Sequence, residues 1–344
     1  MKVQWREARK ISSRHFPFRH PALPLMLRWL IVAALIATSG CQSSLRSLPD
    51  DLPERVELEQ VPFFPQAEYQ CGPAALATVL ENAGVATTPD ALVPMVYLPA
   101  RKGSLQTELV AATRRFDRIP YPLPADVRAL MTQVRAGRPV LVLQNLGLKH
   151  WPQWHFAVVV GFDRASDEVI LRSGTERRAL MSVSRFVRTW DRGGRWAIAV
   201  LQPRELPADP DPERFLTAAA GLEATGRLDA AEAAYETARA AWPESAWPLL
   251  GLANIAYLRE RFATAQSLYR QVIERDPSNL SARYNLADTL AERGCPDAAR
   301  SELQTALTLA ADTAMRARLQ ARLDELPAAN DHDHAACGCA ASSC

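Results

Sequence analysis

Hydrophobic and polar positions follow three different patterns along the chain. Residues 29–38 form an uncharged, mostly apolar run. Residues 56–203 alternate extended apolar segments with helical periodicity, with helices early and strands late, which is typical of an α+β domain. From residue 212 to residue 327 the pattern is Ala-rich and helical throughout, and the Pro- and Asp-rich stretch 204–211 interrupts both patterns. The sequence therefore predicts two domains joined by a linker.

The late part of the first domain predicts neighbouring strands. Four segments are rich in Val, Ile and aromatic residues and are bounded by Gly, Pro or Asp: PVLVLQNL, WHFAVVVGFD, EVILRS and WAIAVLQP. The earlier part begins with the extended apolar segment VPFFP, and three segments with helical spacing follow: CGPAALATVLENAG, SLQTELVAATRRF and ADVRALMTQVRAG.

The second domain repeats with a period of 34 residues. Four columns carry the period: Ala231, Ala265 and Ala299; Tyr235, Tyr269 and Leu303; Ala238, Val272 and Ala306; and Pro243 and Pro277. Gly226 and Gly294 share one position in the turn between paired helices, where the middle copy has Glu260. This pattern resembles tetratricopeptide repeats, whose stacked helix pairs leave a concave groove for peptide or protein binding. A plain helical bundle is the alternative.

The apolar run at residues 29–38 is too short to cross a bilayer of about 30 Å as a helix, but it suits a signal peptide. The small residues before Cys41 resemble the lipobox of bacterial lipoproteins, in which this cysteine is lipidated and begins the mature chain. Gln42 in place of Asp favours the outer membrane, facing the periplasm. We therefore expect a signal peptide at 1–40 and a tether at 41–55. A buried N-terminal helix is the alternative.

Removal of the signal peptide changes the charge balance. Residues 1–40 contain seven basic residues and one acid, so the totals of 40 and 38 become 33 and 37, a net charge of −4. This balance argues against a general nucleic-acid-binding protein. Hydrophobic residues make up 48% and charged residues 23%, which is typical of a globular chain. Met1 and Met26 are both candidate starts, since Met26 opens a signal of conventional length.

One cysteine of the first domain has a context that points to catalysis. Cys71 stands in the run Gln-Cys-Gly-Pro before a helical pattern, and a helix start favours a thiolate by lowering the thiol pKa. A cysteine nucleophile needs a base, and the histidines of this domain are His150 and His155. His155 opens a predicted strand, and the fold can bring it to Cys71. The alternatives are an inert buried thiol and an ordinary strand histidine.

These motifs resemble the papain-like cysteine peptidases of the bacteriocin-leader-processing (double-glycine) type, over about residues 56–203. The resemblance implies a papain-like α+β fold in which Cys71 is the acylated nucleophile and His155 the general base. It also implies that Gln66 donates to the oxyanion, together with the Cys71 backbone N–H. Such a donor is worth about 3 kcal/mol of barrier. A peptidase of this kind hydrolyses peptide bonds without a cofactor.

The glutamine departs from the family pattern by one position. Gln66 lies five residues before Cys71, where relatives usually have six, and Gln70 is adjacent to the cysteine. We prefer Gln66, because a residue next to the nucleophile points away from it in an extended chain.

The residue that orients the histidine is the second departure. Relatives place Asp or Asn on the following strand. If residues 163–168 form a hairpin turn, His155 faces about Ser173 to Thr175. Ser173 could accept the imidazole N–H, and Asn145 on the neighbouring strand is the alternative. Losing an orienting Asp can reduce the rate by up to about 10⁴. A weak or inactive peptidase-like adaptor acting through its repeats is therefore the competing function, and acyl or peptidyl transfer is a third.

The expected disordered tail at residues 328–344 contains a cluster of soft metal ligands. Such a cluster can bind Zn²⁺ or Cu⁺, but Cys-x-Cys matches no closed structural zinc site. A disulfide or a free thiol is the alternative in an oxidising periplasm. We therefore predict no metal cofactor and keep as weak candidates His332, His334, Cys337 and Cys339. The expected partners are a peptide or protein substrate, a protein bound in the repeat groove, and the membrane through a lipid anchor.

Overall fold

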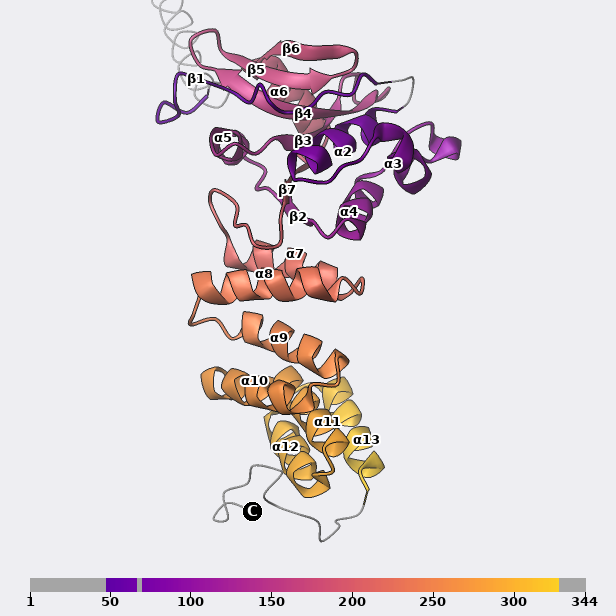
Figure 1. The fold of residues 1–344 in the computed structure, drawn as a ribbon, viewed down its shortest axis with the longest axis vertical. Coiled ribbons are helices and arrows are strands. Elements are labelled where there is room, and N and C mark those ends of the chain that lie inside the picture. The colour runs from indigo at the N-terminus through magenta and orange to yellow at the C-terminus, as the bar shows by residue number, and fades with distance from the viewer. Residues whose placement is uncertain (1–47, 67–69, 328–344) are drawn as a thin grey trace, which may run out of the picture. The chain divides into compact units, whose positions relative to one another are not determined.

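The computed structural model describes residues 48–66 and 70–327. Its first part is built on a seven-stranded sheet with the order β2-β7-β3-β4-β5-β6, and β1 pairs with β4 beside this path (Figure 1). All of the strand pairs are antiparallel. The strands are β1 (Arg55–Glu57), β2 (Ile119–Pro122), β3 (Val140–Asn145), β4 (Trp154–Asp163), β5 (Glu168–Ser173), β6 (Glu176–Ser182) and β7 (Ala197–Leu201).

Helices cover both faces of this sheet. Successive side chains of a strand point to opposite faces, so Leu141 and Leu143 of β3 pack with α2, α3 and α4, whereas Val140 and Val142 pack with α5 and α6. The central strands are therefore buried on both sides, which explains their unbroken apolar runs. The helices are α2 (Cys71–Asn82), α3 (Pro89–Val96), α4 (Gln106–Arg115), α5 (Val127–Arg135) and α6 (Val183–Arg192), with a 3₁₀ turn at Pro99–Arg101.

The four predicted strands correspond to β3, β4, β5 and β7, which lie next to one another in the sheet. The α+β class of this region is confirmed. The sequence patterns do not predict the edge strands. The segment of β2 is IPYP, and proline is tolerated in a strand at the edge of a sheet. The opposite edge, β6, is largely exposed, so its apolar alternation is weak.

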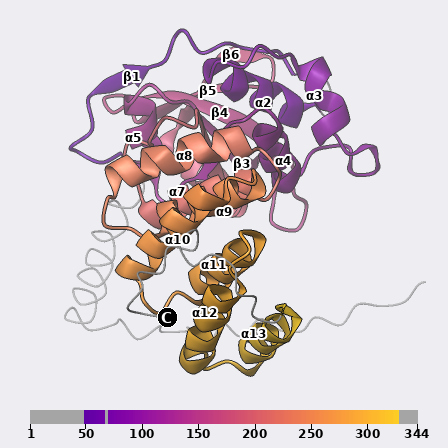
Figure 2. The ribbon, with the colours of Figure 1, turned by 60° about the horizontal axis from the view of Figure 1, so that its bottom comes forward.

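The second part consists of three helix pairs and a closing helix (Figure 2). Each second helix has 14 residues, and the three begin 34 residues apart, at positions 228, 262 and 296. The three repeat columns that lie within the helices are buried between them. The predicted tetratricopeptide architecture is confirmed. The helices are α7 (Pro212–Glu223), α8 (Leu228–Ala241), α9 (Trp247–Leu258), α10 (Phe262–Arg275), α11 (Leu280–Glu292), α12 (Pro296–Leu309) and α13 (Thr313–Glu325).

The turn inside each helix pair has the same left-handed backbone. Gly226 and Gly294 have φ angles of 73° and 76°, and Glu260 adopts 57° at the equivalent position. This region suits glycine, because a Cβ atom crowds the following carbonyl there. The repeat geometry therefore imposes the conformation even where the chain supplies glutamate.

The segments predicted as tether and linker are in contact with the first domain. Leu48 and Leu52 are buried in its core, so the described part of the predicted 41–55 tether is packed rather than free. In the 204–211 stretch, Glu205 forms an ion pair with Arg138 at 2.7 Å. The same hydrophobic cluster continues from the sheet into α7 and α8.

Candidate active site

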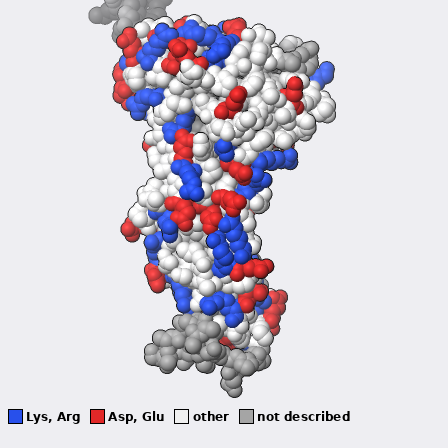
Figure 3. All heavy atoms as spheres, in the orientation of Figure 1, with Lys and Arg blue, Asp and Glu red and all other residues white. Residues whose placement is uncertain are grey.

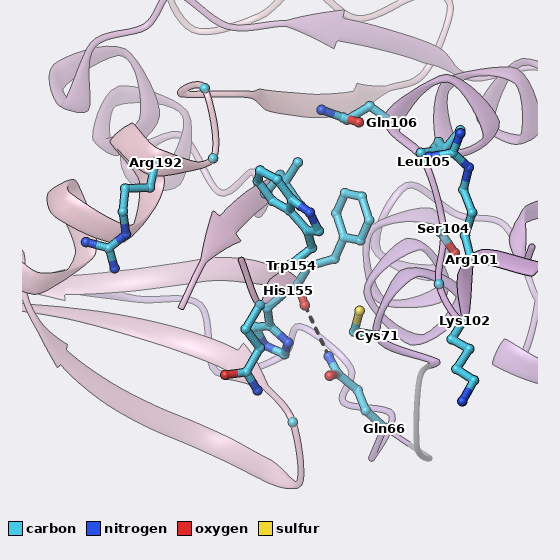
Figure 4. A pocket seen from close by; sticks show the side chains of 17 residues that line it. Gln66, Cys71, Arg101, Lys102, Ser104, Leu105, Gln106, Trp154, His155 and Arg192 are labelled. Carbon is cyan, nitrogen blue, oxygen red and sulfur yellow. Dashed lines mark hydrogen bonds between the residues drawn. The ribbon is translucent and has the colours of Figure 1, made fainter. Parts of the chain in front are cut away.

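A cleft of about 1060 Å³ brings together three of the predicted site residues, Gln66, Cys71 and His155. Cys71 is the first residue of α2, and His155 is the second residue of β4. Figure 4 shows the Cys71 sulfur, the His155 ring and the Gln66 amide around the same space. The other histidine of the domain, His150, is exposed and does not line this cleft.

The start of α2 requires a glycine directly after the cysteine. A Cβ atom on Gly72 would lie 2.3 Å from the Ser104 Oγ, far closer than atoms approach in proteins. Gly72 therefore lets the loop before α4 cross the helix start and close one wall of the cleft. Ser104 also lines the cleft, and its buried Oγ has no hydrogen-bond partner among the described residues. Sequence reasoning missed this serine, because a single hydroxyl in a loop carries no motif.

Burial controls the protonation of the two reactive groups. It raises the pKa of the Cys71 thiol above its ordinary value of 9.0, although main-chain hydrogen bonds at Phe156, Gly72 and Cys71 itself act in the opposite direction. Burial also lowers the pKa of His155 below 6.5. Both pKa shifts favour the neutral forms of the two groups at pH 7. The expectation that the helix start gives a net decrease in the thiol pKa is therefore wrong, because desolvation outweighs the favourable N–H groups.

The group that contacts the outer nitrogen of the His155 ring, where relatives have Asp or Asn, is the hydroxyl of Ser173. The β4–β5 hairpin pairs Asp163 with Glu168, and a bulge lies between Val159 and Gly161. This register brings the Ser173 Oγ to 2.8 Å from the His155 Nε2. Because Nε2 is engaged by serine, Nδ1 is the ring nitrogen left to exchange a proton in the cleft.

Asn145, the alternative to Ser173, is used in another way. Its Oδ1 accepts the main-chain N–H groups of Gly147 and Gln153, at 3.0 and 2.9 Å, and its Nδ2 donates to the Leu148 carbonyl. These bonds shape the loop between β3 and β4. Asn145 therefore supports the loop that leads into His155 rather than the imidazole itself.

Gln66 is held at the cleft by both its main chain and its side chain. Its N–H donates to the Gly174 carbonyl at 3.0 Å, and its Nε2 donates to the Phe156 carbonyl at 3.3 Å. One amide N–H is used in the latter bond, so a second remains for a ligand. Gln70 is not among the described residues that line the cleft.

A buried arginine connects the segment before Gln66 to β5, the strand that ends at Ser173. Arg172, next to Ser173, is 4% exposed. It donates to the main-chain carbonyls of Leu58, Glu59 and Val61, and at 2.6 Å to that of Arg177. These bonds fix the segment before Gln66 against the sheet. Sequence analysis did not single out this residue, since an arginine on a strand usually points to solvent.

The mouth of the cleft combines positive charge with exposed aromatic surface. Arg101 and Lys102 lie on one side and Arg192 on the other (Figure 4), and no Asp or Glu is among the described residues that line the cleft. Trp154 lines the cleft and is 56% exposed, while Trp151 in the preceding loop is 82% exposed. The mouth therefore offers cationic and apolar contacts to a ligand.

Several predicted features lie outside the described residues. These are the lipidation candidate Cys41, the signal peptide and the tail with its histidines and cysteines. Within residues 48–66 and 70–327, no group of three or more His, Cys, Asp or Glu side chains is placed to hold a metal ion. No helix in these ranges is long and apolar enough to cross a membrane.

Comparison with known proteins assigns the two parts of the chain. Residues 58–196 match the Peptidase_C39 like family, and residues 256–323 match the tetratricopeptide repeat family. The chain thus joins a C39-like peptidase region to tetratricopeptide repeats, as the sequence motifs predict.

Solved structures give distant likenesses only. A putative C39-like peptidase from Bacillus anthracis is 18% identical, with a TM-score of 0.37, over 43% of this chain and 98% of that chain. The type III secretion translocator chaperone SycD from Yersinia enterocolitica is 18% identical, with a TM-score of 0.31, over 33% and 80% of the two chains. PcrH from Pseudomonas aeruginosa is 21% identical, with a TM-score of 0.31, over 33% and 89%. No match was found among curated proteins.

Proposed function

We propose that the protein is a cysteine peptidase that hydrolyses peptide bonds through a thioester at Cys71, with a repeat domain that binds a partner or substrate. The observation that carries this proposal is the shared cleft of Cys71, His155 and Gln66, with His155 held by Ser173 at 2.8 Å. A nucleophile, a base, an orienting group and an oxyanion donor are the parts that acyl transfer requires.

The reaction begins with a neutral pair. As the Cys71 sulfur attacks the scissile carbonyl carbon, its proton passes to the His155 Nδ1. The carbonyl oxygen becomes an oxyanion that accepts the Cys71 N–H and the Gln66 amide N–H. Collapse breaks the C–N bond, and the amine leaves with the proton from His155. Water, deprotonated by His155, then hydrolyses the thioester and restores the thiol.

The residues that line the cleft favour a peptide substrate with acidic side chains. Arg101, Lys102 and Arg192 line the cleft, and no Asp or Glu is among its described lining residues. Charge complementarity with these basic side chains favours a peptide that has acidic side chains near the cleaved bond. The exposed Trp154 favours an apolar neighbour in the same peptide.

Peptide profiling tests this proposal. The chain without residues 1–40 and its Cys71→Ala variant are incubated with a peptide mixture, and intact-mass spectrometry records any acyl-enzyme. We expect cleavage and a covalent adduct for the parent chain, and neither for the Cys71→Ala variant. Equal product from both proteins would refute catalysis by Cys71. Products that form only with an added amine would indicate acyl transfer in place of hydrolysis.

A catalytically weak adaptor is the second candidate. It is favoured by the neutral Cys71–His155 pair and by a neutral serine where a carboxylate would stabilise the imidazolium. In this case Cys71→Ala leaves the biological role intact, whereas substitutions in the repeat groove abolish it.

Export and lipid anchoring at Cys41 are also proposals. The apolar run before this residue and the small residues that precede it support them. Metabolic labelling with a fatty acid should mark the wild-type chain and leave Cys41→Ser unlabelled, and fractionation should place the labelled protein in the outer membrane. Labelling of both chains would exclude Cys41 as the lipidated residue.

A further inference from the structure

A chain of hydrogen-bonded polar side chains links all three helix pairs of the repeats. Tyr235 donates to Glu223 at 2.7 Å, and Asn254 donates to the same carboxylate at 3.1 Å. The Asn254 Oδ1 in turn accepts the hydroxyl of Tyr269 at 2.9 Å and the amide of Asn285 at 3.0 Å. These bonds fix the side chains in place before any ligand arrives.

Glu223 is the charged member of this chain, and its charge is not neutralised. Its two described hydrogen-bond donors, Tyr235 and Asn254, are both neutral. Burial, together with the bond to Glu223, raises the pKa of Tyr235, so the tyrosine stays protonated. No Lys, Arg or His among the described residues forms an ion pair with Glu223, whereas Asp288 nearby pairs with Arg322 at 2.5 Å. A carboxylate has about four acceptor positions, so Glu223 retains two.

This carboxylate faces a hollow that is large enough for side chains. Two adjoining hollows of about 220 and 410 Å³ share Glu223, Asn254 and Leu258 as lining residues. Leu258 is 58% exposed, and Trp247 at the other hollow is also exposed. An apolar wall thus stands beside an uncompensated negative charge.

Charge is mixed on the face of the repeats that Figure 3 presents. Figure 3 shows Lys, Arg, Asp and Glu interspersed along the helices on the face it presents. No single sign of charge dominates this face, so a local group such as Glu223 is the candidate source of charge selectivity. The cleft of the peptidase part has the opposite local charge, with three cations and no described acid.

We infer that the repeat groove binds a peptide segment of a partner protein that carries a basic side chain next to an apolar one. The ammonium or guanidinium group bonds to Glu223, and the apolar side chain packs on Leu258 and Trp247. This inference deepens the partner-binding half of the proposed function. It gives the groove and the catalytic cleft different preferences, basic-apolar for the groove and acidic for the cleft.

The test uses the full chain with Cys71→Ala, so that binding is measured without cleavage. The probe is a short fluorescent peptide, acetylated and amidated, with Lys-Leu pairs in a Gly-Ser background, and fluorescence anisotropy gives its Kd. A hydrogen bond to a charged group predicts that replacing Lys by Gln weakens binding about tenfold or more. The difference should shrink as salt is raised.

Variants test whether the peptide binds at the two hollows beside Glu223 or elsewhere on the surface. Glu223→Gln should reduce the affinity for the Lys-Leu peptide to that for its Gln analogue, and Leu258→Ser should weaken both peptides. The matched control is Glu236→Gln, since Glu236 pairs with Arg239 and does not line either hollow. Thermal unfolding checks that each variant is folded, and Leu258 is exposed enough to be replaced without loss of core packing.

The outcomes distinguish this inference from the proposed catalysis. A preference for Lys that survives Glu223→Gln, or equal binding of the two peptides to the parent chain, overturns the inference. Failure of the peptidase assay leaves the binding result unaffected, because every protein here lacks the Cys71 thiol.

Discussion

Replacing Ser173 by aspartate tests how His155 is oriented. The His155 Nε2 lies 2.8 Å from the Ser173 Oγ, a neutral hydrogen bond worth about 0.5–1.5 kcal/mol, whereas a bond to a charged group is worth about 1.5–3 kcal/mol. The carboxylate should therefore stabilise the imidazolium that forms when Cys71 loses its proton, by about 1 kcal/mol or about fivefold in rate. It should also raise the pKa of His155. Ser173→Ala leaves the Nε2–H unpaired and should slow the reaction by a similar factor.

The assay for this prediction is alkylation of Cys71 by iodoacetamide as a function of pH. Peptide mass spectrometry assigns the modification to Cys71, which is a free thiol in the structure. Because burial raises the thiol pKa, the parent rate should be low at pH 7 and increase above pH 9.0. Ser173→Asp should increase the rate near neutral pH, and this gain should vanish in a His155→Ala background. Identical pH profiles for the parent and both Ser173 variants would show that Ser173 does not act on His155.

Three further predictions concern stability. Burial lowers the pKa of His155 below 6.5, so the unfolded chain binds a proton there that the folded chain does not, and the free energy of unfolding should fall as pH decreases below 6.5. His155→Gln should make that fall shallower in urea unfolding, and an unchanged slope would contradict it. Glu260→Gly should stabilise the protein by up to about 1 kcal/mol by relieving a positive φ, with Gly294→Ala as the opposite control in thermal unfolding. Gly72→Ala should destabilise the protein and abolish activity through its clash with Ser104, and a fully active variant would exclude this packing.

The sequence predicts those elements whose apolar pattern can be recognised within a single stretch of the chain. The strands β3, β4, β5 and β7 are buried on both faces, and the repeat columns bury small and aromatic residues at a fixed period. The edge strand β2 contains two prolines and pairs with β7, which is far away in the sequence, and the edge strand β6 is largely exposed. Local pattern cannot supply that information.

Only the site residues that stand in a sequence motif could be predicted. Cys71 and His155 stand in recognisable runs, whereas Ser104 and Arg172 act through contacts that only the folded chain creates. The protonation of Cys71 and His155 could not be predicted from the sequence either. The helix start of Cys71 is local and favours a thiolate, but the desolvation that opposes it comes from the surrounding fold.

The junction between the two parts gives a final prediction. Phe215, Leu216 and Leu222 of α7 belong to the same hydrophobic cluster as Tyr121 of β2. The Tyr121 hydroxyl also accepts the Asp211 N–H at 3.2 Å.

Polar contacts reinforce this junction. Arg227, at the start of α8, donates to both carboxylate oxygens of Asp117, at 2.6 and 2.8 Å. A chain of residues 48–203 loses these contacts and exposes the edge of the sheet beneath α7. Each large apolar side chain that loses its cover costs about 1.5–3 kcal/mol, so such a chain should unfold at a clearly lower urea concentration than residues 48–243, which retain α7 and α8. Equal midpoints would show that the peptidase part folds independently of its first repeat, and that the 204–211 stretch is a true linker.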